Sequence, residues 1–377
     1  MRVLVFIFMA MALSAPGMAA AGTPLERKVD AYLAPWLAER KFSGEVLIAR
    51  GDRVLLEKAY GLGSVELRVP NTPQSKFQIA SVSKPLTAAV ILKLVERGQV
   101  DIGAPVSAYV PEYPAGRDIT IEQLLTHTSG VPDINGLPVY EDLSLRRRTP
   151  ADVVAAFKDA PLQFRPGSAY AYSNSNYALL ALVIERVTGQ PYGEVMQREL
   201  FAPLGMVDTG HRGEASAIIP NMAQGYVRSS AGALARAPWF DWSVKTGNGS
   251  LYSTGRDLHR FIRGYFGGRV IGARLLALAT TPRPVPPRAA GFDWLSRDIG
   301  YGWMLDRNLG RRRVFHIGRS PGYSAALAYY PDDELTVVVL SNIYVDVTLP
   351  ASEALAAMVL APKAPPAPTS APGSSGS

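Results

Sequence analysis

The chain contains no cysteine among its 377 residues. This absence excludes disulfide bonds, a thiol nucleophile, a cysteine-ligated metal site and a lipid-anchored cysteine. Long apolar runs are also missing after the first residues, since no later stretch approaches the roughly 20 apolar residues that a membrane-spanning helix needs. The sequence therefore predicts no transmembrane segment and no chemistry that depends on sulfur.

Acidic residues are fewer than basic ones, with 32 Asp and Glu against 39 Lys and Arg, which gives a formal net charge of +7 at pH 7. Much of the excess comes from scattered arginines, including those at 146–148 and 311–313, a pattern more typical of a solvated surface than of a nucleic-acid site. We therefore predict no nucleic-acid partner. The hydrophobic content of 47% is enough for a large core, in one large domain or in two interleaved ones.

The two ends of the chain differ in composition from the rest. Residues 1–21 combine a basic start, the apolar run 3–13 and the small residues of SAPGMAAA, a pattern typical of a secretory signal peptide. Residues 362–377 are rich in Pro, Ala, Ser and Gly, which predicts a disordered tail. We expect residues 22–361 to form the folded domain of a periplasmic or secreted protein.

Strand patterns lie near both ends of the chain, and helical patterns lie between them. The run GEVLIAR-GD-RVLLEKAY predicts a hairpin around a Gly-Asp turn, and SAALAYYPDDELTVVVLSN predicts a second hairpin. Helical periodicity occurs in LERKVDAYLAPWLAER and PASEALAAMVLA at the two ends, and in ADVVAAFKDA and SNYALLALVIERVTGQ between them. These patterns predict an α+β fold, in which an antiparallel β-sheet is flanked by the N- and C-terminal helices and carries a mostly helical insertion.

A serine and a lysine lie three residues apart in FQIASVSKPLTAAVILKLVERG, where the pattern predicts the first turn of an apolar helix. Ser81 and Lys84 would share one helix face, so the lysine amine can approach the serine hydroxyl. Pro85 is tolerated if the helix starts at Ser81, because the first four backbone N–H groups have no intrahelical partner. The helix start also favours developing negative charge. Taken alone, the motif favours the alternative of an N-cap serine beside a lysine that extends to solvent.

A second motif, Y-x-N, lies in RPGSAYAYSNSNYALL, directly before a predicted helix. Tyr172 beside a lysine could ionise more easily and act as a base, while Asn174 offers amide donors and an acceptor. The alternative interpretation is a polar loop in which Tyr170, Tyr172 and Tyr177 are half-buried packing residues.

A third motif, H-x-G, lies in RVFHIGRSPGYSAALAYY. On a strand, His316 and Gly318 share a face, and a glycine there would let a substrate approach the backbone. The same spacing recurs at His211 and Gly213, so this motif alone is not specific.

Together the three motifs resemble those of the serine hydrolase family that contains class C β-lactamases, DD-peptidases and related esterases, where H-x-G is a variant of K-T-G. The segments LLTHTSGVPD, FAPLGMVDTG and GSLYSTGRDLHRF also resemble family segments. The resemblance extends from Leu25 to Leu360. It implies a β-lactamase/transpeptidase-like fold, a small-molecule or peptide substrate, and a reaction without metal or cofactor. The sequence does not indicate an oligomeric state.

The resemblance implies acyl transfer through a covalent ester on Ser81. Lys84 and Tyr172 would together remove the hydroxyl proton and return it to the leaving group, and which of them is the base stays open. The backbone amides of Ser81 and Arg319 would form the oxyanion hole, and Asn174 would hydrogen-bond the substrate.

Lys245-Thr246-Gly247 spells K-T-G, but its surroundings resemble a glycine-rich loop of the family and not the strand before the C-terminal hairpin. We therefore assign the third motif to His316 and regard Lys245 as a rim residue. His211 is expected in a surface loop. His127, in HTSG, is expected in a structural turn near the site.

The substrate can be a carboxylic ester or an amide or peptide bond; a β-lactamase or D-alanyl-D-alanine peptidase is the alternative, and an inactive peptidoglycan-binding homologue is a further one. An unperturbed histidine is mostly neutral at pH 7, and Lys84 nearby would discourage protonation of His316 further. Arg319 should project to the opposite strand face from His316. The pattern therefore favours esters or neutral peptide ends over penicillins.

Overall fold

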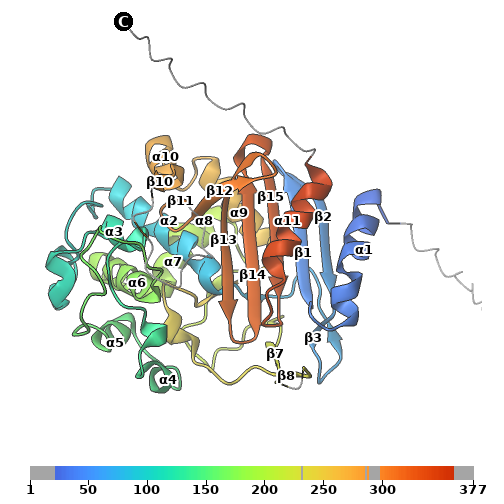
Figure 1. The fold of residues 1–377 in the computed structure, drawn as a ribbon, viewed down its shortest axis with the longest axis horizontal. Helices are drawn as coiled ribbons and strands as arrows, with labels where there is room; N and C mark the ends of the chain where they lie inside the picture. The colour runs from blue at the N-terminus through green and yellow to red at the C-terminus, as the bar shows by residue number, and fades with distance from the viewer. Residues whose placement is uncertain (1–21, 231, 285–286, 288–297, 361–377) are drawn as a thin grey trace, which may run out of the picture.

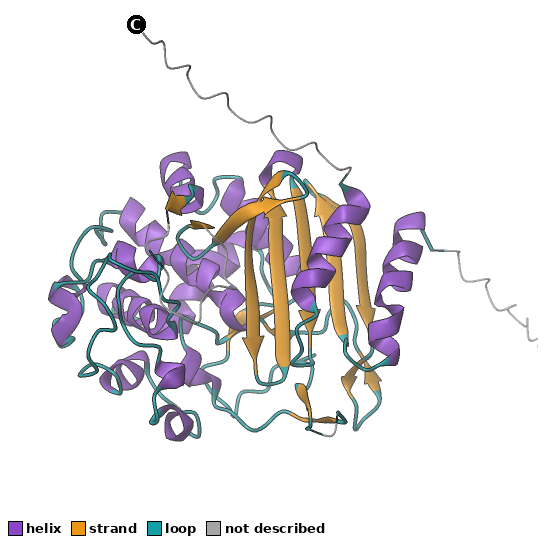
Figure 2. Ribbon diagram, viewed as in Figure 1, coloured by secondary structure: helices purple, strands orange, loops and turns teal. Residues whose placement is uncertain are grey.

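A computed structural model describes residues 22–230, 232–284, 287 and 298–360 of the chain. The predicted signal peptide (1–21) and the predicted tail (362–377) lie outside these residues. The described part has a large antiparallel sheet with helices on both faces and a mostly helical region at one side (Figures 1 and 2). The α+β prediction is thus confirmed.

The large sheet has eight strands in the order β10-β11-β12-β13-β14-β15-β1-β2, all antiparallel. The first strand, β1, therefore pairs directly with the last described strand, β15, and β2 forms the edge beside it. The strands are β1 (Gly44–Arg50), β2 (Arg53–Tyr60), β10 (Arg283–Pro284), β11 (Asp298–Ile299), β12 (Met304–Asn308), β13 (Arg311–Ser320), β14 (Tyr323–Tyr330) and β15 (Leu335–Ser341). Both predicted hairpins are present, as β1–β2 and β14–β15.

Alternate residues of the central strands face two separate hydrophobic clusters, as the two-residue period of a strand requires. On β1, Val46 and Ile48 belong to the cluster under α1 (Pro24–Ala38) and α11 (Thr348–Val359). Leu47 and Ala49 point the other way, into a larger cluster shared with the helical region. Each central strand is buried on both faces, so it reads as a continuous apolar run.

The helical region lies between β2 and β10 in the sequence. Its helices are α2 (Ser83–Glu96), α3 (Ile121–Leu125), α4 (Tyr140–Leu143), α5 (Pro150–Ala155), α6 (Asn174–Thr188), α7 (Tyr192–Met196), α8 (Ala202–Leu204), α9 (Gly255–Phe266) and α10 (Ala273–Thr280). Three small sheets join β3 (Leu62–Ser64) with β4 (Val69–Pro70), β5 (Phe77–Gln78) and β6 (Gly210–His211) with β9 (Leu251–Ser253), and β7 (Tyr226–Arg228) with β8 (Leu234–Arg236). None of the helices in the described ranges is long and apolar enough to cross a membrane.

The start of α2 differs from the prediction. The α-helix begins at Ser83, and Ser81 lies in a short 3-10 turn, η1 (Ala80–Val82), that leads into it. Ala80 adopts a left-handed backbone conformation with φ 47°, which turns the chain sharply out of β5. Pro85 is the third residue of α2, where its missing N–H costs no intrahelical bond, so the reason we gave for tolerating it still holds.

Candidate active site

Ser81 lies at the junction between the sheet and the helical region. The η1 turn packs against β13, and α2 continues from it into the larger hydrophobic cluster. Ser81 itself is only partly buried, whereas the ten residues that follow it are buried. The fold therefore leaves this one hydroxyl accessible on an otherwise buried turn.

Lys84 reaches Ser81 as the spacing predicted, and its side chain is completely buried. Its Nζ donates to Ser81 Oγ at 3.0 Å, to Asn174 Oδ1 at 2.8 Å and to the backbone carbonyl of Asn248 at 2.9 Å. All three acceptors are uncharged. Burial, reinforced by the positive charge of Lys245, lowers the pKa of Lys84 well below its ordinary value, and Asp133 opposes this shift only in part.

Tyr172 completes a group of three with Ser81 and Lys84. The Lys84 Nζ lies 4.8 Å from the centre of the Tyr172 ring, and the His127 ring stacks against the Tyr172 ring with the ring centres 4.4 Å apart. Burial raises the pKa of the Tyr172 hydroxyl, and a hydrogen bond with Ser81 offsets that shift in part. The environment thus keeps the phenol protonated, in contrast to our suggestion that the neighbouring lysine would ease its ionisation.

Asn174 is the first residue of α6 and lies next to Lys84. Its Oδ1 accepts from Lys84, while its Nδ2 donates to Asp133 Oδ2 at 3.2 Å and its backbone N–H donates to Asp133 Oδ1 at 3.0 Å. Asn174 therefore links the lysine to a carboxylate. Its expected role as a substrate ligand stays a prediction, and only the second amide hydrogen remains available for it.

His316 lies on β13 with its ring centre 6.5 Å from that of Tyr172. Its Nδ1 contacts the carbonyl oxygen of Ile317 at 2.7 Å; a carbonyl can only accept, so Nδ1 carries the proton and Nε2 is an acceptor. Burial lowers the pKa of His316 to about 3, helped by the charge of Lys84. The imidazole is therefore neutral at pH 7, as the sequence predicted.

Gly318 occupies a position where β13 touches the η1 turn. A Cβ on this residue would lie 2.2 Å from the carbonyl oxygen of Ile79 and 3.0 Å from the backbone N of Ser81. We expected this glycine to admit a substrate; instead it admits the turn that carries Ser81. The close approach sets the backbone of the nucleophile beside the edge of β13.

Arg319 points its side chain away from the site. The guanidinium pairs with Asp346 at 3.1 Å, and 42% of the side chain is exposed. Its backbone amide faces the site, however. The closing pair Ser320–Tyr323 flanks a two-residue turn and is hydrogen-bonded, so the N–H of Arg319, one residue earlier, points away from β14. Because β12 pairs only as far as Phe315, that edge of β13 is open beside Ser81.

Three residues near the site have positions that the motifs alone could not give: Asp133, Asn248 and His127. Asn248 comes from a loop and contacts Lys84 directly, whereas Asp133 comes from another loop and contacts Asn174, so both positions depend on the folded helical region. His127, placed near the site by its segment, accepts at Nδ1 from the backbone N–H of Ser173 at 3.2 Å and contacts Asn176 Nδ2 at 3.1 Å. It thereby fixes the loop that carries Tyr172.

His211 lies away from this group, beside a separate cavity. A cavity of about 920 Å³ is lined in part by Tyr192, His211, Thr246 and Tyr252, but not by Ser81, Lys84 or Tyr172. His211 contacts Thr246 Oγ1 at 3.1 Å, and burial lowers the pKa of its imidazole to about 4. In the part of the chain that the structure describes, no three His, Asp or Glu side chains cluster as metal ligands would.

Comparison with known proteins agrees with this geometry. The Beta-lactamase family model matches residues 25–360. This chain belongs to the Beta-lactamase family. It is 30% identical over 319 residues to penicillin-binding protein 4* of Bacillus subtilis, and the alignment covers 81% of this chain and 69% of that protein. The family assignment makes the chain a serine hydrolase, as the motifs predicted.

Two solved structures share the fold of this chain. A penicillin-binding protein from Bacillus halodurans aligns with a TM-score of 0.76 and 26% identity, covering 90% of this chain and 99% of that one. An octameric penicillin-binding protein homologue from Pyrococcus abyssi aligns with a TM-score of 0.78 and 27% identity, covering 89% of this chain and 77% of that one. The architecture of this Beta-lactamase family chain is therefore a known one.

Proposed function

We propose that this protein hydrolyses carboxylic esters or amide and peptide bonds through a covalent acyl-enzyme on Ser81. One observation carries the proposal: the completely buried Lys84 amine contacts the Ser81 hydroxyl and otherwise only uncharged acceptors. A buried amine without a partner carboxylate favours its neutral form, which can accept a proton. Lys84 is the better base of the two candidates, because burial acts in the opposite direction on Tyr172 and keeps that hydroxyl protonated.

In the proposed reaction, Lys84 and Tyr172 carry the proton of Ser81 to the leaving group. Ser81 Oγ bonds to the carbonyl carbon as its proton passes to Lys84 Nζ, and the carbonyl oxygen becomes an oxyanion beside the amides of Ser81 and Arg319. The bond to the leaving group breaks as Tyr172 donates its proton to that group, and Lys84 restores the proton to Tyr172. Water then attacks the Ser81 ester, and its proton passes by way of Tyr172 to Lys84. Lys84 returns a proton to Ser81 Oγ as the acid is released.

The lack of charge on His316 affects which substrates the site favours. A substrate carboxylate next to the leaving group would meet an imidazole without charge where classical penicillin-binding enzymes have a lysine. The Arg319 side chain does not replace that charge, since it lies on the opposite strand face and pairs with Asp346. Esters and neutral amide or peptide ends are therefore favoured over penicillins and cephalosporins.

A substrate panel tests the proposal. We expect purified protein to hydrolyse p-nitrophenyl acetate or butyrate, and to show a much lower kcat/KM for benzylpenicillin and a chromogenic cephalosporin, with D-Ala-D-Ala peptides as the third arm. A penicillin kcat/KM in the range of roughly 10⁶ M⁻¹s⁻¹ without ester turnover would contradict the preference.

Covalent labelling tests the nucleophile separately. A fluorophosphonate probe should add once to the protein, and peptide mapping should place the adduct on Ser81. The replacement Ser81→Ala should abolish labelling and lower turnover by on the order of 10³-fold or more. An adduct on Ser129 or Ser250 would overturn the assignment.

We further propose that the mature protein acts outside the cytoplasm, on the basis of the signal-like residues 1–21. Fractionation of the producing cells and N-terminal sequencing of the recovered protein test this. A mature N-terminus near residue 22 in the periplasmic or culture fraction is expected, and an uncleaved cytoplasmic protein would contradict it.

A further inference from the structure

Lys245 is a buried cation beside the candidate site. Only 6% of the residue is exposed, and its Nζ lies 5.3 Å from the centre of the Phe240 ring and 5.6 Å from that of Tyr140. Within the described ranges, its ammonium group has neither a hydrogen bond nor an ion pair. The two aromatic rings attract the charge without neutralising it.

Such an arrangement is costly for stability alone. A buried charge normally has a counterion, because desolvation of an unpaired ion destabilises the fold. The Lys245 amine lies over two neighbouring aromatic rings and pairs with no carboxylate among the described residues, so it is available to an anion from outside. The rings also offer an apolar wall for the carbon chain that carries such an anion.

The position of Lys245 relative to Ser81 follows from the loop between them. A Cβ built on Gly249 would lie 3.3 Å from Lys245 Cδ and 3.6 Å from the carbonyl carbon of Ala80, so the lysine stem and the η1 turn flank the same glycine. The backbone N–H of Asn248 donates to the Lys245 carbonyl, and the carbonyl of Asn248 accepts from Lys84. Lys245 thus borders the nucleophile on the side of residues 248–249.

Tyr172 borders Ser81 on a different side. The Lys84 amine has the Tyr172 ring at 4.8 Å in one direction and the Asn248 carbonyl in another. In the proposed reaction the leaving group must lie within hydrogen-bond reach of Tyr172 to receive its proton. The acyl portion of the substrate then occupies another side of Ser81, and the side that Lys245 borders is the candidate for it.

A second cation extends the same wall. Phe240 packs edge-on against Trp242 at 5.3 Å, and the Arg212 guanidinium lies 6.0 Å from the centre of the Trp242 ring. None of the ion pairs found in the described residues involves Arg212. The wall of Tyr140, Phe240 and Trp242 is therefore aromatic with positive charge at two places.

We propose that Lys245 binds a carboxylate on the acyl portion of the substrate, with Phe240 and Tyr140 contacting the carbon chain that carries it. The inference rests on the proposed function, since it names the substrate class of the same site. It differs from carboxylate binding at the third motif, because the anion lies on the acyl side and not beside the leaving group. The preferred substrates are acyl esters or amides that end in a carboxylate.

Two esters of equal chain length test the proposal: p-nitrophenyl hexanoate, which is neutral, and mono-p-nitrophenyl adipate, which carries a terminal carboxylate. We expect the wild type to prefer the adipate ester, after correction for hydrolysis without enzyme. Lys245→Met should lower the adipate-to-hexanoate ratio of kcat/KM by roughly tenfold or more, because it removes a desolvated ion pair, whereas its effect on the pKa of Lys84 is common to both esters. Lys245→Arg should retain the preference.

A control variant separates recognition of the carboxylate from a general effect of losing one positive charge. Lys28→Met removes one charge from an exposed position on α1 and should leave the ratio of the two substrates unchanged. Equal losses on both esters in Lys245→Met, or no adipate preference in the wild type, would overturn the proposal.

A binding measurement that does not need turnover distinguishes this proposal from the proposed function. In Ser81→Ala protein, monomethyl adipate should bind more tightly than methyl hexanoate by calorimetry, and Lys245→Met should remove that difference. If neither p-nitrophenyl ester is hydrolysed but the binding difference persists, the proposed function fails and the anion site stands. If monomethyl adipate binds no better than methyl hexanoate, the anion site fails.

Discussion

Burial, and not ion pairing, is the main cause of the shifted pKa values in the site. Lys84 contacts only uncharged acceptors, His127 and His316 are buried near its charge, and Tyr172 lies beneath the His127 ring. Burial lowers the pKa of both histidines and of Lys84, and it raises the pKa of Tyr172. Burial therefore favours the uncharged forms of these side chains, which suits proton transfer to and from a hydroxyl.

Lys84 and Tyr172 should behave as one unit, because both contact the same Ser81 hydroxyl. We expect the double variant Lys84→Ala/Tyr172→Phe to be little slower than the slower single variant, measured as kcat/KM on p-nitrophenyl hexanoate. Losses that add fully in the double variant would instead indicate separate roles.

The pH profile should report the lowered pKa of Lys84. The base is active once deprotonated, so kcat/KM for a neutral ester should rise with pH and level off well below 10.5, the ordinary value. Lys245 lowers this pKa and Asp133 raises it, so Lys245→Met should move the rise to higher pH, whereas Asp133→Asn should move it to lower pH. Rate measurements across pH 4 to 10 check both directions; shifts of the same sign in the two variants would refute this account.

The sequence patterns predicted which residues form the site, but they predicted only some of the contacts between those residues. The contact between Ser81 and Lys84 could be predicted because it depends only on their spacing along the chain. The outward direction of the Arg319 side chain could be predicted because side chains alternate along a strand. The partner of Asn174 could not be predicted in the same way, since Asp133 lies on a distant loop whose position depends on the packing of the whole helical region. The turn beside Gly318 was likewise a long-range contact.

At the scale of elements, helices and strands with strong apolar periodicity were predicted at the right positions, whereas short or partly polar ones were not. Both hairpins and the helices α1, α6 and α11 formed where their apolar patterns predicted. The helix in ADVVAAFKDA ends at Ala155, earlier than its pattern suggested, and the short strands β10 and β11 carried no signal of their own. Those strands form because they extend an existing sheet edge, which a local pattern does not encode.

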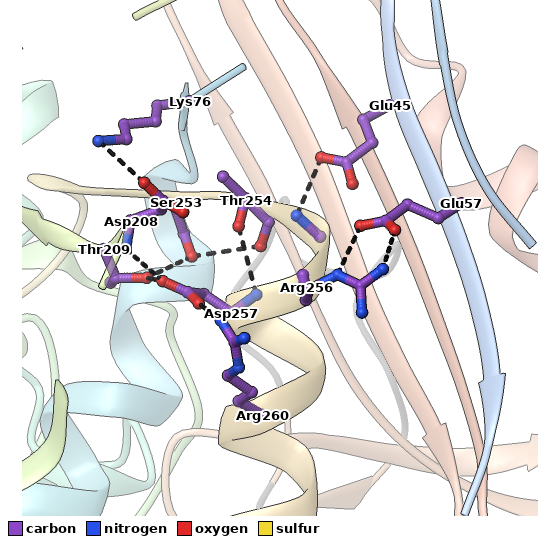
Figure 3. A network of polar contacts seen from close by, with 11 residues as sticks. Glu45, Glu57, Lys76, Asp208, Thr209, Ser253, Thr254, Arg256, Asp257 and Arg260 are labelled. Atoms are coloured by element: carbon purple, nitrogen blue, oxygen red, sulfur yellow. Dashed lines mark hydrogen bonds and ion pairs between the residues drawn. The ribbon is translucent and has the colours of Figure 1, made fainter. Parts of the chain in front are cut away.

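The start of α9 is held by a polar network that includes a buried carboxylate (Figure 3). Thr254 caps the helix, and Glu45 of β1 accepts from the backbone N–H of Gly255 at 3.0 Å. The other oxygen of Glu45 is buried with no hydrogen-bond partner in the described part of the chain. Burial raises the pKa of Glu45 from an ordinary 4.5 to about 8 despite the bond from Gly255.

Glu45 should therefore make stability fall as pH rises. Between pH 4.5 and about 8 the folded state holds a proton that the unfolded state has lost, so unfolding becomes easier by about 1.4 kcal/mol per pH unit from this group. Glu45→Gln imitates the protonated form. We expect it to be close to the wild type at pH 4.5 and more stable near pH 8 in urea unfolding; an equal difference at both pH values would contradict the assignment.

At the scale of the whole molecule, one sheet separates two hydrophobic clusters and joins both ends of the chain. Residues of α1, β1 and α11 meet in the smaller cluster, while α2, α6 and α9 pack in the larger one. The site lies where the larger cluster meets the end of β13. Its geometry therefore depends on packing supplied by segments from the start, middle and end of the sequence.

A mutation in the smaller cluster should affect the entire domain. Leu355 of α11 is completely buried there, and Leu355→Ala should cost about 2–5 kcal/mol through lost contacts and a cavity. Circular dichroism and ester turnover should then be lost together at a lower denaturant concentration. Retention of activity after the loss of α11 structure would show that the two clusters unfold independently.

The pairing of β1 with β15 also has a consequence for the order of events during synthesis. The β1–β2 hairpin emerges early from the ribosome, but its neighbour in the sheet is Leu335–Ser341, close to the end of the chain. Until that strand has been made, the hairpin has an unpaired edge and the sheet has no centre, and such distant pairing is slow. A growing chain of this design therefore keeps one edge of its first hairpin open to other strands until Leu335–Ser341 has been made.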